Sequence, residues 1–156
     1  MVDEQASPAQ DRIRTTITTD ELAELLRQRG FRAEMLADAS GTPVIRSASQ
    51  GILFHVRLGN LANTGDGRYL DYTFVCPLQL DAPPPADVVT GWNAGHRFAR
   101  AYGHDRMFVL EMDVLLAGGV AETHLRATLE VWDHLLQQVV AFLRQRLAPG
   151  GAAAAG

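Results

Sequence analysis

Two carboxylates in the second half of the chain are spaced so that they could act together. Glu111 and Asp113 stand two positions apart in the run MFVLEMDVLL, so in a β-strand both side chains project from the same face. Paired carboxylates can carry out general acid–base catalysis or bind a divalent cation. Together with a histidine they would define a small-ligand or metal-dependent enzyme. The structural alternative is that they pair with Arg97 or Arg100, or simply face solvent.

The other residues capable of metal or covalent chemistry form no known motif. No two histidines have the i,i+4 spacing of a helical zinc pair, and the single cysteine has no CxxC partner. These residues are His55, His96, His104, His124, His134 and Cys76. Ser47 and Ser49 lie outside any GxSxG sequence, and the run NLANTGDGR lacks the lysine and following helix of a phosphate-binding loop. We therefore predict no catalytic residue, no metal and no cofactor.

A third group of residues is better suited to binding than to catalysis. Arg97 and Arg100 flank Phe98 in a segment whose periodicity predicts a helix, and both would lie on one side of that helix. Such a patch could bind an acidic or phosphorylated segment of a partner protein. The alternative is that both arginines pair internally with Glu111 or Asp113.

Hydrophobic periodicity indicates the elements that hold these residues. A first helix starts at a capping box formed by Thr18 and Glu21 and stops at Gly30. Its buried stripe consists of Leu22, Leu25 and Leu26. Strands follow over residues 31–35, 44–47, 51–58 and 69–78. Because consecutive strands are joined by short polar turns, they predict an antiparallel sheet.

A proline run then breaks the sheet and opens a second helix. This helix is predicted over residues 86–102, with Trp92 and Tyr102 facing the core. Gly91 and Gly95 weaken it, and small residues four positions apart suggest close packing against a neighbour.

The last third of the chain predicts a long strand and a long helix. Residues 106–116 read as a central strand, and residues 122–147 as an amphipathic helix with Trp132 on its buried stripe. The buried face of the strand would consist of Phe108, Leu110, Met112, Val114 and Leu116. The order α-ββββ-α-β-α predicts an α+β fold, with an antiparallel sheet of about five strands flanked by helices.

Composition and charge limit the possible partners. The chain has 156 residues, of which 47% are hydrophobic and 21% charged, values typical of one globular domain. A net charge of −4 argues against binding to nucleic acid or to anionic membranes. A single cysteine, no secretory signal and no apolar run of membrane-spanning length favour a cytoplasmic protein. The domain is expected over residues 17–147, between disordered tails at 1–16 and 148–156.

Several runs of sequence carry a resemblance to a known family. The runs WN, RFARAY, VLEMDVLL and GGV, followed by an amphipathic helix, resemble the YbjN family of bacterial sensory transduction regulators. The earlier run TTDELAELLRQRGF is similar to the first helix and turn of that family, so the resemblance covers roughly residues 17–143. The matching positions are Trp92, Asn93, Arg97, Phe98, Ala99, Arg100, Glu111, Asp113, Gly118 and Gly119.

The resemblance implies a fold and a mode of action, but no agreed enzymatic activity. It implies a fold similar to that of type III secretion chaperones, and a homodimer. The chain departs from the family pattern where the last helix opens, because Ala121 and His124 replace the usual Thr or Ser and Glu of a capping box. We therefore predict a loosely fixed helix start, which Ala121→Thr would stabilise by about 1 kcal/mol.

The sequence thus favours a non-enzymatic, regulatory or chaperone-like protein-interaction module. Its groove would bind an extended peptide of an unidentified protein partner through backbone pairing and apolar pockets. The predicted binding residues are Trp92, Asn93, Arg97, Phe98, Arg100, Glu111 and Asp113. The alternative is a small-ligand or metal-dependent enzyme that uses Glu111, Asp113 and a histidine.

Overall fold

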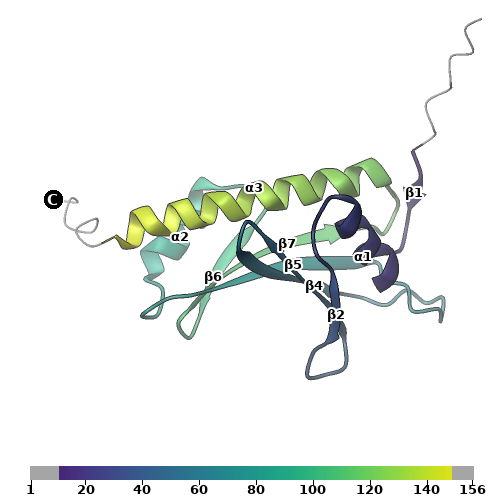
Figure 1. The fold of residues 1–156 in the computed structure, drawn as a ribbon, viewed down its shortest axis with the longest axis horizontal. Coiled ribbons are helices and arrows are strands. Elements are labelled where there is room, and N and C mark those ends of the chain that lie inside the picture. The colour runs from purple at the N-terminus through teal and green to yellow at the C-terminus, as the bar shows by residue number, and fades with distance from the viewer. Residues whose placement is uncertain (1–10, 149–156) are drawn as a thin grey trace, which may run out of the picture.

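The computed structural model describes residues 11–148, and its main feature is a six-stranded antiparallel sheet (Figure 1). In sheet order, the strands are β2 (Glu34–Ala37), β3 (Pro43–Ser49), β4 (Ile52–Leu58), β5 (Asp71–Gln79), β7 (Met107–Leu115) and β6 (Arg100–His104). The helices are α1 (Thr19–Gln28), α2 (Ala86–Gly95) and α3 (Glu122–Leu147). Two further strands, β1 (Ile13–Arg14) and β8 (Val120–Ala121), form a separate pair. The predicted α+β class is confirmed, with one strand more than expected in the main sheet.

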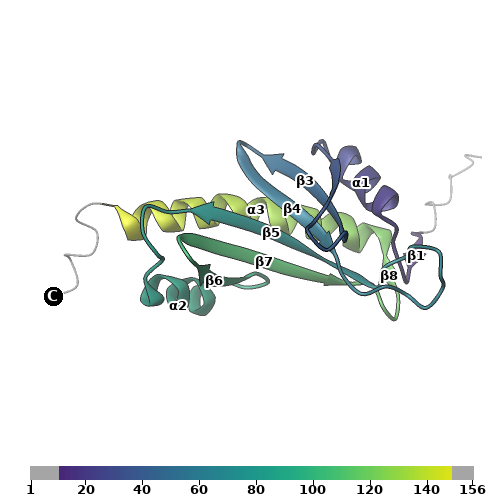
Figure 2. The ribbon, with the colours of Figure 1, turned by 90° about the horizontal axis from the view of Figure 1, so that it is seen from below.

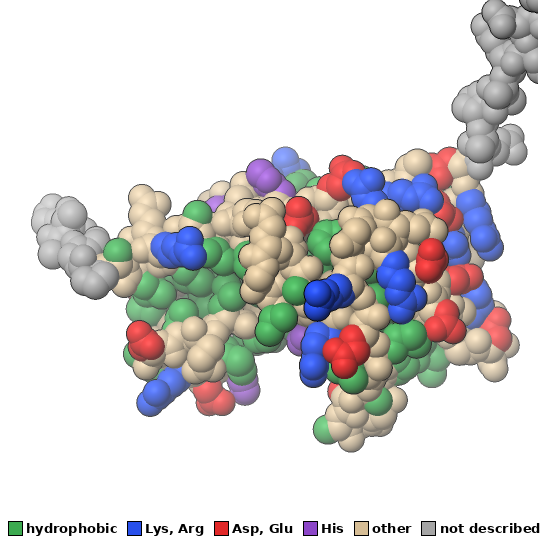
Figure 3. All heavy atoms as spheres, viewed as in Figure 1, with side chains coloured by type: hydrophobic (Ala, Val, Ile, Leu, Met, Phe, Trp, Pro, Cys, Tyr) green, Lys and Arg blue, Asp and Glu red, His purple; other side chains and the backbone are tan. Residues whose placement is uncertain are grey.

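The helices and the sheet form two layers. α3 runs along one face of the sheet, with α1 beside it at one end and α2 at the other (Figures 1 and 2). Seen from below, β5 and β7 lie in front of α3, and no described helix covers this side of the sheet (Figure 2). We call this side the open face. Charged side chains gather at the α1 end, whereas the end with the C-terminal half of α3 is more apolar (Figure 3).

The core lies between the sheet and α3. All five residues predicted for the inner face of β7 are buried, as is Trp132 of α3. The Trp132 ring stacks on Phe74 with ring centroids 5.3 Å apart and meets Phe54 edge-on at 5.9 Å. Each such buried aromatic side chain removes a large apolar area from water and contributes about 1.5–3 kcal/mol. The periodicity of β7 and α3 therefore predicted this interface correctly.

The first helix begins and ends as its sequence predicts. The Thr18 hydroxyl accepts a hydrogen bond from the Glu21 N–H at 3.1 Å, and the Glu21 carboxylate accepts one from the Thr18 N–H at 3.0 Å. The chain then leaves the helix through Gly30, whose φ of +85° is readily adopted only by glycine. Both features of the predicted capping are confirmed.

The start of α3 is held more firmly than predicted. Ala121 provides no side-chain cap, but the segment before α1 pairs with β8 and supplies other acceptors. The Arg12 carbonyl accepts from the Glu122 N–H at 2.8 Å, and Asp11 accepts from the Thr123 N–H at 3.2 Å. The folded structure therefore begins before the predicted boundary at residue 17. Residues 1–10 and 149–156 of the predicted tails lie outside the described residues.

The largest error of the sequence prediction lies in the second helix. α2 ends at Gly95, and residues 100–104 form the edge strand β6 instead of continuing the helix. Tyr102 consequently lies on the open side of this strand and is 41% exposed rather than buried. A Cβ at Gly91 would meet the flexible end of the Arg146 side chain and lie 3.7 Å from the Phe142 ring of α3, whereas nothing lies within 4 Å at Gly95.

Candidate protein-interaction surface

Two side chains of α2 fix the strand that follows it. Trp92 is fully buried, and its indole N–H donates to the Ala99 carbonyl at 3.2 Å. The Asn93 amide substitutes for a neighbouring strand, because it accepts from the Ala101 N–H at 2.7 Å and donates to the Ala101 carbonyl at 3.0 Å. Trp92 and Asn93 were both predicted to bind a partner. Trp92 is instead buried in the core, and Asn93, although exposed, is engaged with the backbone of Ala101, so that both hold β6 against α2.

The turn between α2 and β6 presents an aromatic side chain to solvent. Phe98 has a φ of +75°, an unfavourable conformation for a residue with a Cβ, and its side chain is 68% exposed. The Arg97 guanidinium lies 5.1 Å from the centre of the Phe98 ring, within the range of a cation–π contact. Among residues 11–148, Arg97 forms no ion pair, so its charge remains available at the surface.

Glu111 is the centre of an ionic network on the open face. It is only 4% exposed, although it faces away from the helices. Its carboxylate accepts from Arg100 Nη2 at 2.5 Å and from the Tyr102 hydroxyl at 2.9 Å, and Arg57 Nη2 lies 3.7 Å away. The network joins β4, β7 and β6, and it compensates the cost of burying the charge of Glu111.

Asp113 takes part in the same network from the next position on the open face. Arg100 Nη1 donates to it at 2.5 Å and the Thr73 hydroxyl at 2.6 Å. Partial burial favours a raised pKa for Asp113, but these hydrogen bonds outweigh that effect and the pKa is lowered. The hydrogen bond to Asp113 is also the main reason that the pKa of Arg100 is raised. The alternative that Arg100 pairs internally with these carboxylates is therefore confirmed. Arg100 does so from a strand, although the sequence placed it on a helix.

Neither His55 nor His96 joins the two carboxylates. His55 lies in the same row of the sheet as Glu111, but Val75 separates the two in the register. His96 stacks on the ring of Trp92, with centroids 3.7 Å apart. Within the described residues, no group of three or more His, Cys, Asp or Glu side chains is arranged to hold a metal ion.

The edge of β7 is only partly covered, because β6 is shorter than β7. Pairing between them stops at Arg100 and Glu111, so the C-terminal part of β7 continues past the loop that leads into β6 (Figure 2). The N–H and C=O of Ala101 point outward to Asn93, away from β7. Because the direction of these backbone groups alternates along paired antiparallel strands, the N–H and C=O of Glu111 point toward β6. The same alternation directs the backbone groups of Asp113 and Leu115 to the outer edge. No backbone hydrogen bond from the described residues satisfies them there.

Two adjoining hollows lie beside this free edge. One, of about 380 Å³, lies between the end of β7 and α3, and the other, of about 580 Å³, continues between α3 and the turn after α2. Phe98, Ala127 and Val131 line both of them. Leu115, which lines the first, is 63% exposed. We call the combination of the two hollows and the free edge of β7 the edge groove.

The family assignment follows from comparison with known proteins. The family model YbjN, described as "Putative bacterial sensory transduction regulator", matches residues 18–145. The chain belongs to this family. No curated protein and no solved structure matches it significantly. None of the helices in the described part of the chain combines the length and apolarity needed to cross a membrane.

Sequence reasoning found only some of the residues that form this surface. It identified Phe98, Arg97, Arg100 and both carboxylates, but it missed Arg57, Thr73 and Tyr102 of the ionic network. It also missed Leu115 and the free edge. Arg57 lies within the strand predicted over residues 51–58, yet only the register between strands brings it to Glu111.

Proposed function

We propose that the chain is a non-enzymatic regulatory module of the bacterial cytoplasm that binds an extended segment of a partner protein in the edge groove. The observation that carries the proposal is the pair of outward-facing backbone groups at Asp113 and Leu115, next to the exposed ring of Phe98. An unpaired strand edge beside apolar pockets is the arrangement used in β-strand addition. The mode of binding would be chaperone-like, since it captures a strand rather than a folded surface.

The groove supports binding through two kinds of contact. The N–H and C=O groups of two edge residues offer up to four backbone hydrogen bonds, each with a net value of about 0.5–1.5 kcal/mol. Alternate side chains of the bound segment would point into the hollows, against Phe98 and Val131. Backbone pairing would supply affinity, and the apolar hollows would supply selectivity.

The charges around the groove suggest a feature of the partner. Arg97 is free to pair with an acidic or phosphorylated residue, whereas Arg100 is already occupied by Glu111 and Asp113. Among the predicted binding residues, the proposal therefore assigns direct contact to Arg97, Phe98 and Asp113. It assigns a positioning role to Arg100 and Glu111, which keep the end of β7 in place.

The test removes one backbone donor without changing the sheet. The N–H of Leu115 faces outward, so Leu115→Pro deletes a group at the free edge while leaving the β5–β7 ladder intact. Tagged protein would be cross-linked in lysate of its source cells, and the partners quantified by mass spectrometry. We expect at least one partner to be lost tenfold or more with Leu115→Pro and with Phe98→Ser.

Two controls make the result specific. Leu115→Ala keeps the backbone donor and should retain more of that partner than Leu115→Pro does. Leu53→Ala alters an exposed leucine on the open face, away from the groove, and should retain it fully. A partner recovered equally with all variants, or recovery of the chain alone, would contradict the proposal.

The proposal also includes a homodimer, which rests on the family resemblance. The opposite edge of the sheet, β2, is exposed along all of its residues, so it offers a second unpaired edge. Light scattering during size exclusion should give twice the mass of one chain at micromolar concentration. A single-chain mass over this range would remove the dimer from the proposal without affecting the edge groove.

A further inference from the structure

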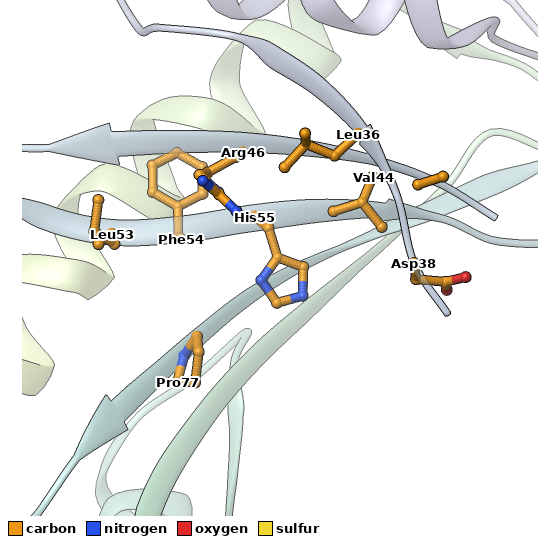
Figure 4. Close-up of a pocket in the computed structure, with 9 residues that line it drawn as sticks. Leu36, Asp38, Val44, Arg46, Leu53, Phe54, His55 and Pro77 are labelled. Carbon is orange, nitrogen blue, oxygen red and sulfur yellow. The ribbon is translucent and has the colours of Figure 1, made fainter. Parts of the chain in front are cut away.

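A separate hollow opens on the open face, away from the edge groove. It has a volume of about 430 Å³, and Figure 4 shows the residues that line it. Leu36, Val44, Leu53 and Pro77 are among the apolar ones, and the principal polar ones are Arg46 and His55. They come from β2, β3, β4 and β5. We call this space the open-face hollow.

The hollow exists because β4 and β5 separate. Their pairing runs from Leu58 and Tyr72 to His55 and Val75 and then stops, although both strands continue. Pro77 lies just beyond, and it has no N–H to donate to β4. The thiol of Cys76 instead donates to the Leu53 carbonyl at 3.4 Å. The strand that carries Pro77 diverges from the β3–β4 pair in Figure 4, and the imidazole of His55 lies in the space between them.

His55 contributes an uncommitted hydrogen-bonding group to this space. Its ring is partly buried, and it forms no hydrogen bond with any described residue. Burial is the main cause of its lowered pKa, and the nearby charges of Arg57 and Arg46 lower it further, against an opposing effect of Glu111. A neutral imidazole at neutral pH can donate one hydrogen bond and accept another.

The guanidinium of Arg46 in the lining favours an anion. Arg46 is 3.6 Å from Glu34, longer than a charge-assisted hydrogen bond of about 2.7–2.9 Å, so it keeps donors free. Asp38, the one acidic residue of the lining, already accepts three hydrogen bonds within its own turn, from Ser40 and Thr42.

We propose that the open-face hollow binds a small organic anion, in which an apolar body rests on Leu36, Val44, Leu53 and Pro77 and an acidic group meets Arg46 and His55. The volume lies in the range of small-molecule sites, about 300–1,000 Å³. Apolar walls with a few converging polar groups are the usual composition of such sites. The proposal is independent of the edge groove, because the two sites share no lining residue.

A pair of matched fluorescent probes tests both halves of the proposal. 8-Anilinonaphthalene-1-sulfonate is an aromatic anion, and N-phenyl-1-naphthylamine has the same aromatic body without the charge. We expect saturable binding of the anion to the full chain. Arg46→Met should weaken it at least fivefold while changing the affinity for the neutral probe less than twofold, and Leu53→Asp should weaken both probes at least fivefold.

Controls locate the effect in this hollow. Arg144→Met removes an exposed arginine of α3, on the other side of the sheet, and should change neither affinity. Phe98→Ser alters only the edge groove and should leave the Arg46-dependent difference unchanged. Thermal unfolding of each variant checks that the fold is retained. No saturable binding of the anion, or binding that Arg46→Met and Leu53→Asp leave unchanged, would overturn the proposal.

Discussion

The side-chain amide of Asn93 forms two hydrogen bonds with the backbone of Ala101, at 2.7 and 3.0 Å, along the outer edge of β6. A single side chain of α2 therefore satisfies both outward-facing backbone groups of Ala101. It prevents a further strand from pairing at Ala101, whereas the part of β7 beyond Glu111 remains uncovered by β6. The position of the edge groove depends on this contact.

Asn93→Ala should destabilise the protein by about 1–3 kcal/mol, because it leaves the donor and the acceptor of Ala101 without partners. Asn63→Ala, which changes an exposed asparagine of the β4–β5 loop, should have an effect within about 0.5 kcal/mol. Urea unfolding followed by circular dichroism measures both. Equal stability of the two variants would show that water replaces the Asn93 contacts without cost.

Glu111 and Asp113 should contribute very differently to stability, although they share Arg100. Glu111→Gln leaves the donors of Arg100 and Tyr102 facing a neutral, buried amide, so we expect a loss of about 1–3 kcal/mol. This expected loss of stability is smaller than for a fully buried ion pair, because the side chains of Arg100 and Arg57 are about half exposed and water screens their charges. Asp113→Asn should cost less than about 1 kcal/mol, because Asp113 is largely exposed. The same unfolding assay decides, and equal losses would contradict this difference.

His55 should make stability depend on pH. Because its pKa in the folded state lies below the usual 6.5, the unfolded chain binds a proton more readily than the folded one. Folding stability should therefore fall as the pH decreases from above 6.5 through the lower folded pKa. His55→Gln should lose less stability than the parent protein between pH 7.5 and pH 5.0 in parallel urea titrations. Identical pH dependence of the two proteins would argue against a depressed pKa.

The start of α3 should respond only weakly to a new cap. Ala121→Thr could offer its hydroxyl to the N–H of His124, but Arg12 and Asp11 already satisfy the N–H groups of Glu122 and Thr123. We expect a gain of about 0.5 kcal/mol, smaller than the sequence alone suggested. In a double-mutant cycle with Asp11→Ala, the gain should increase, as measured by the midpoint of urea unfolding. A gain that is the same in both backgrounds would show that Asp11 does not act as a cap.

The sequence best predicted the elements whose hydrophobic repeat continues without interruption. β7 and α3 repeat their apolar residues over many positions, so their buried faces could be identified before the structure was known. The segment after Trp92 failed because its apolar residues continue at helical spacing, whereas the chain leaves the helix at Gly95. The hydrogen bonds from Trp92 and Asn93 to residues 99 and 101 are tertiary contacts, and local propensity does not include them. The low helix propensity of Gly91 and Gly95 was the one available warning.

The candidate sites depended on register, which periodicity does not provide. The pairing of Arg100 with Glu111 could be anticipated as one of two alternatives, because opposite charges lay close in sequence. The free edge at Leu115 arises from the different lengths of β6 and β7, and the open-face hollow from the separation of two strands at Pro77. The free edge and the open-face hollow both depend on how neighbouring strands pair with each other. A proline within a predicted strand was the local signal for the second of them.

The backbone conformation of Phe98 should reduce stability, whereas its exposed ring serves binding. A residue with a Cβ at a φ of +75° is disfavoured by about 1–2 kcal/mol, and glycine avoids this cost at the expense of greater freedom in the unfolded chain. Phe98→Gly should therefore raise the free energy of unfolding by about 0.5–1 kcal/mol, and it should lower partner recovery in the cross-linking assay at least fivefold. Gln50→Gly is the matched control, because Gln50 is exposed and has a φ of +48° in the β3–β4 turn. It should gain similar stability with unchanged recovery. If Phe98→Gly instead retained full recovery, the ring would have no role in the edge groove.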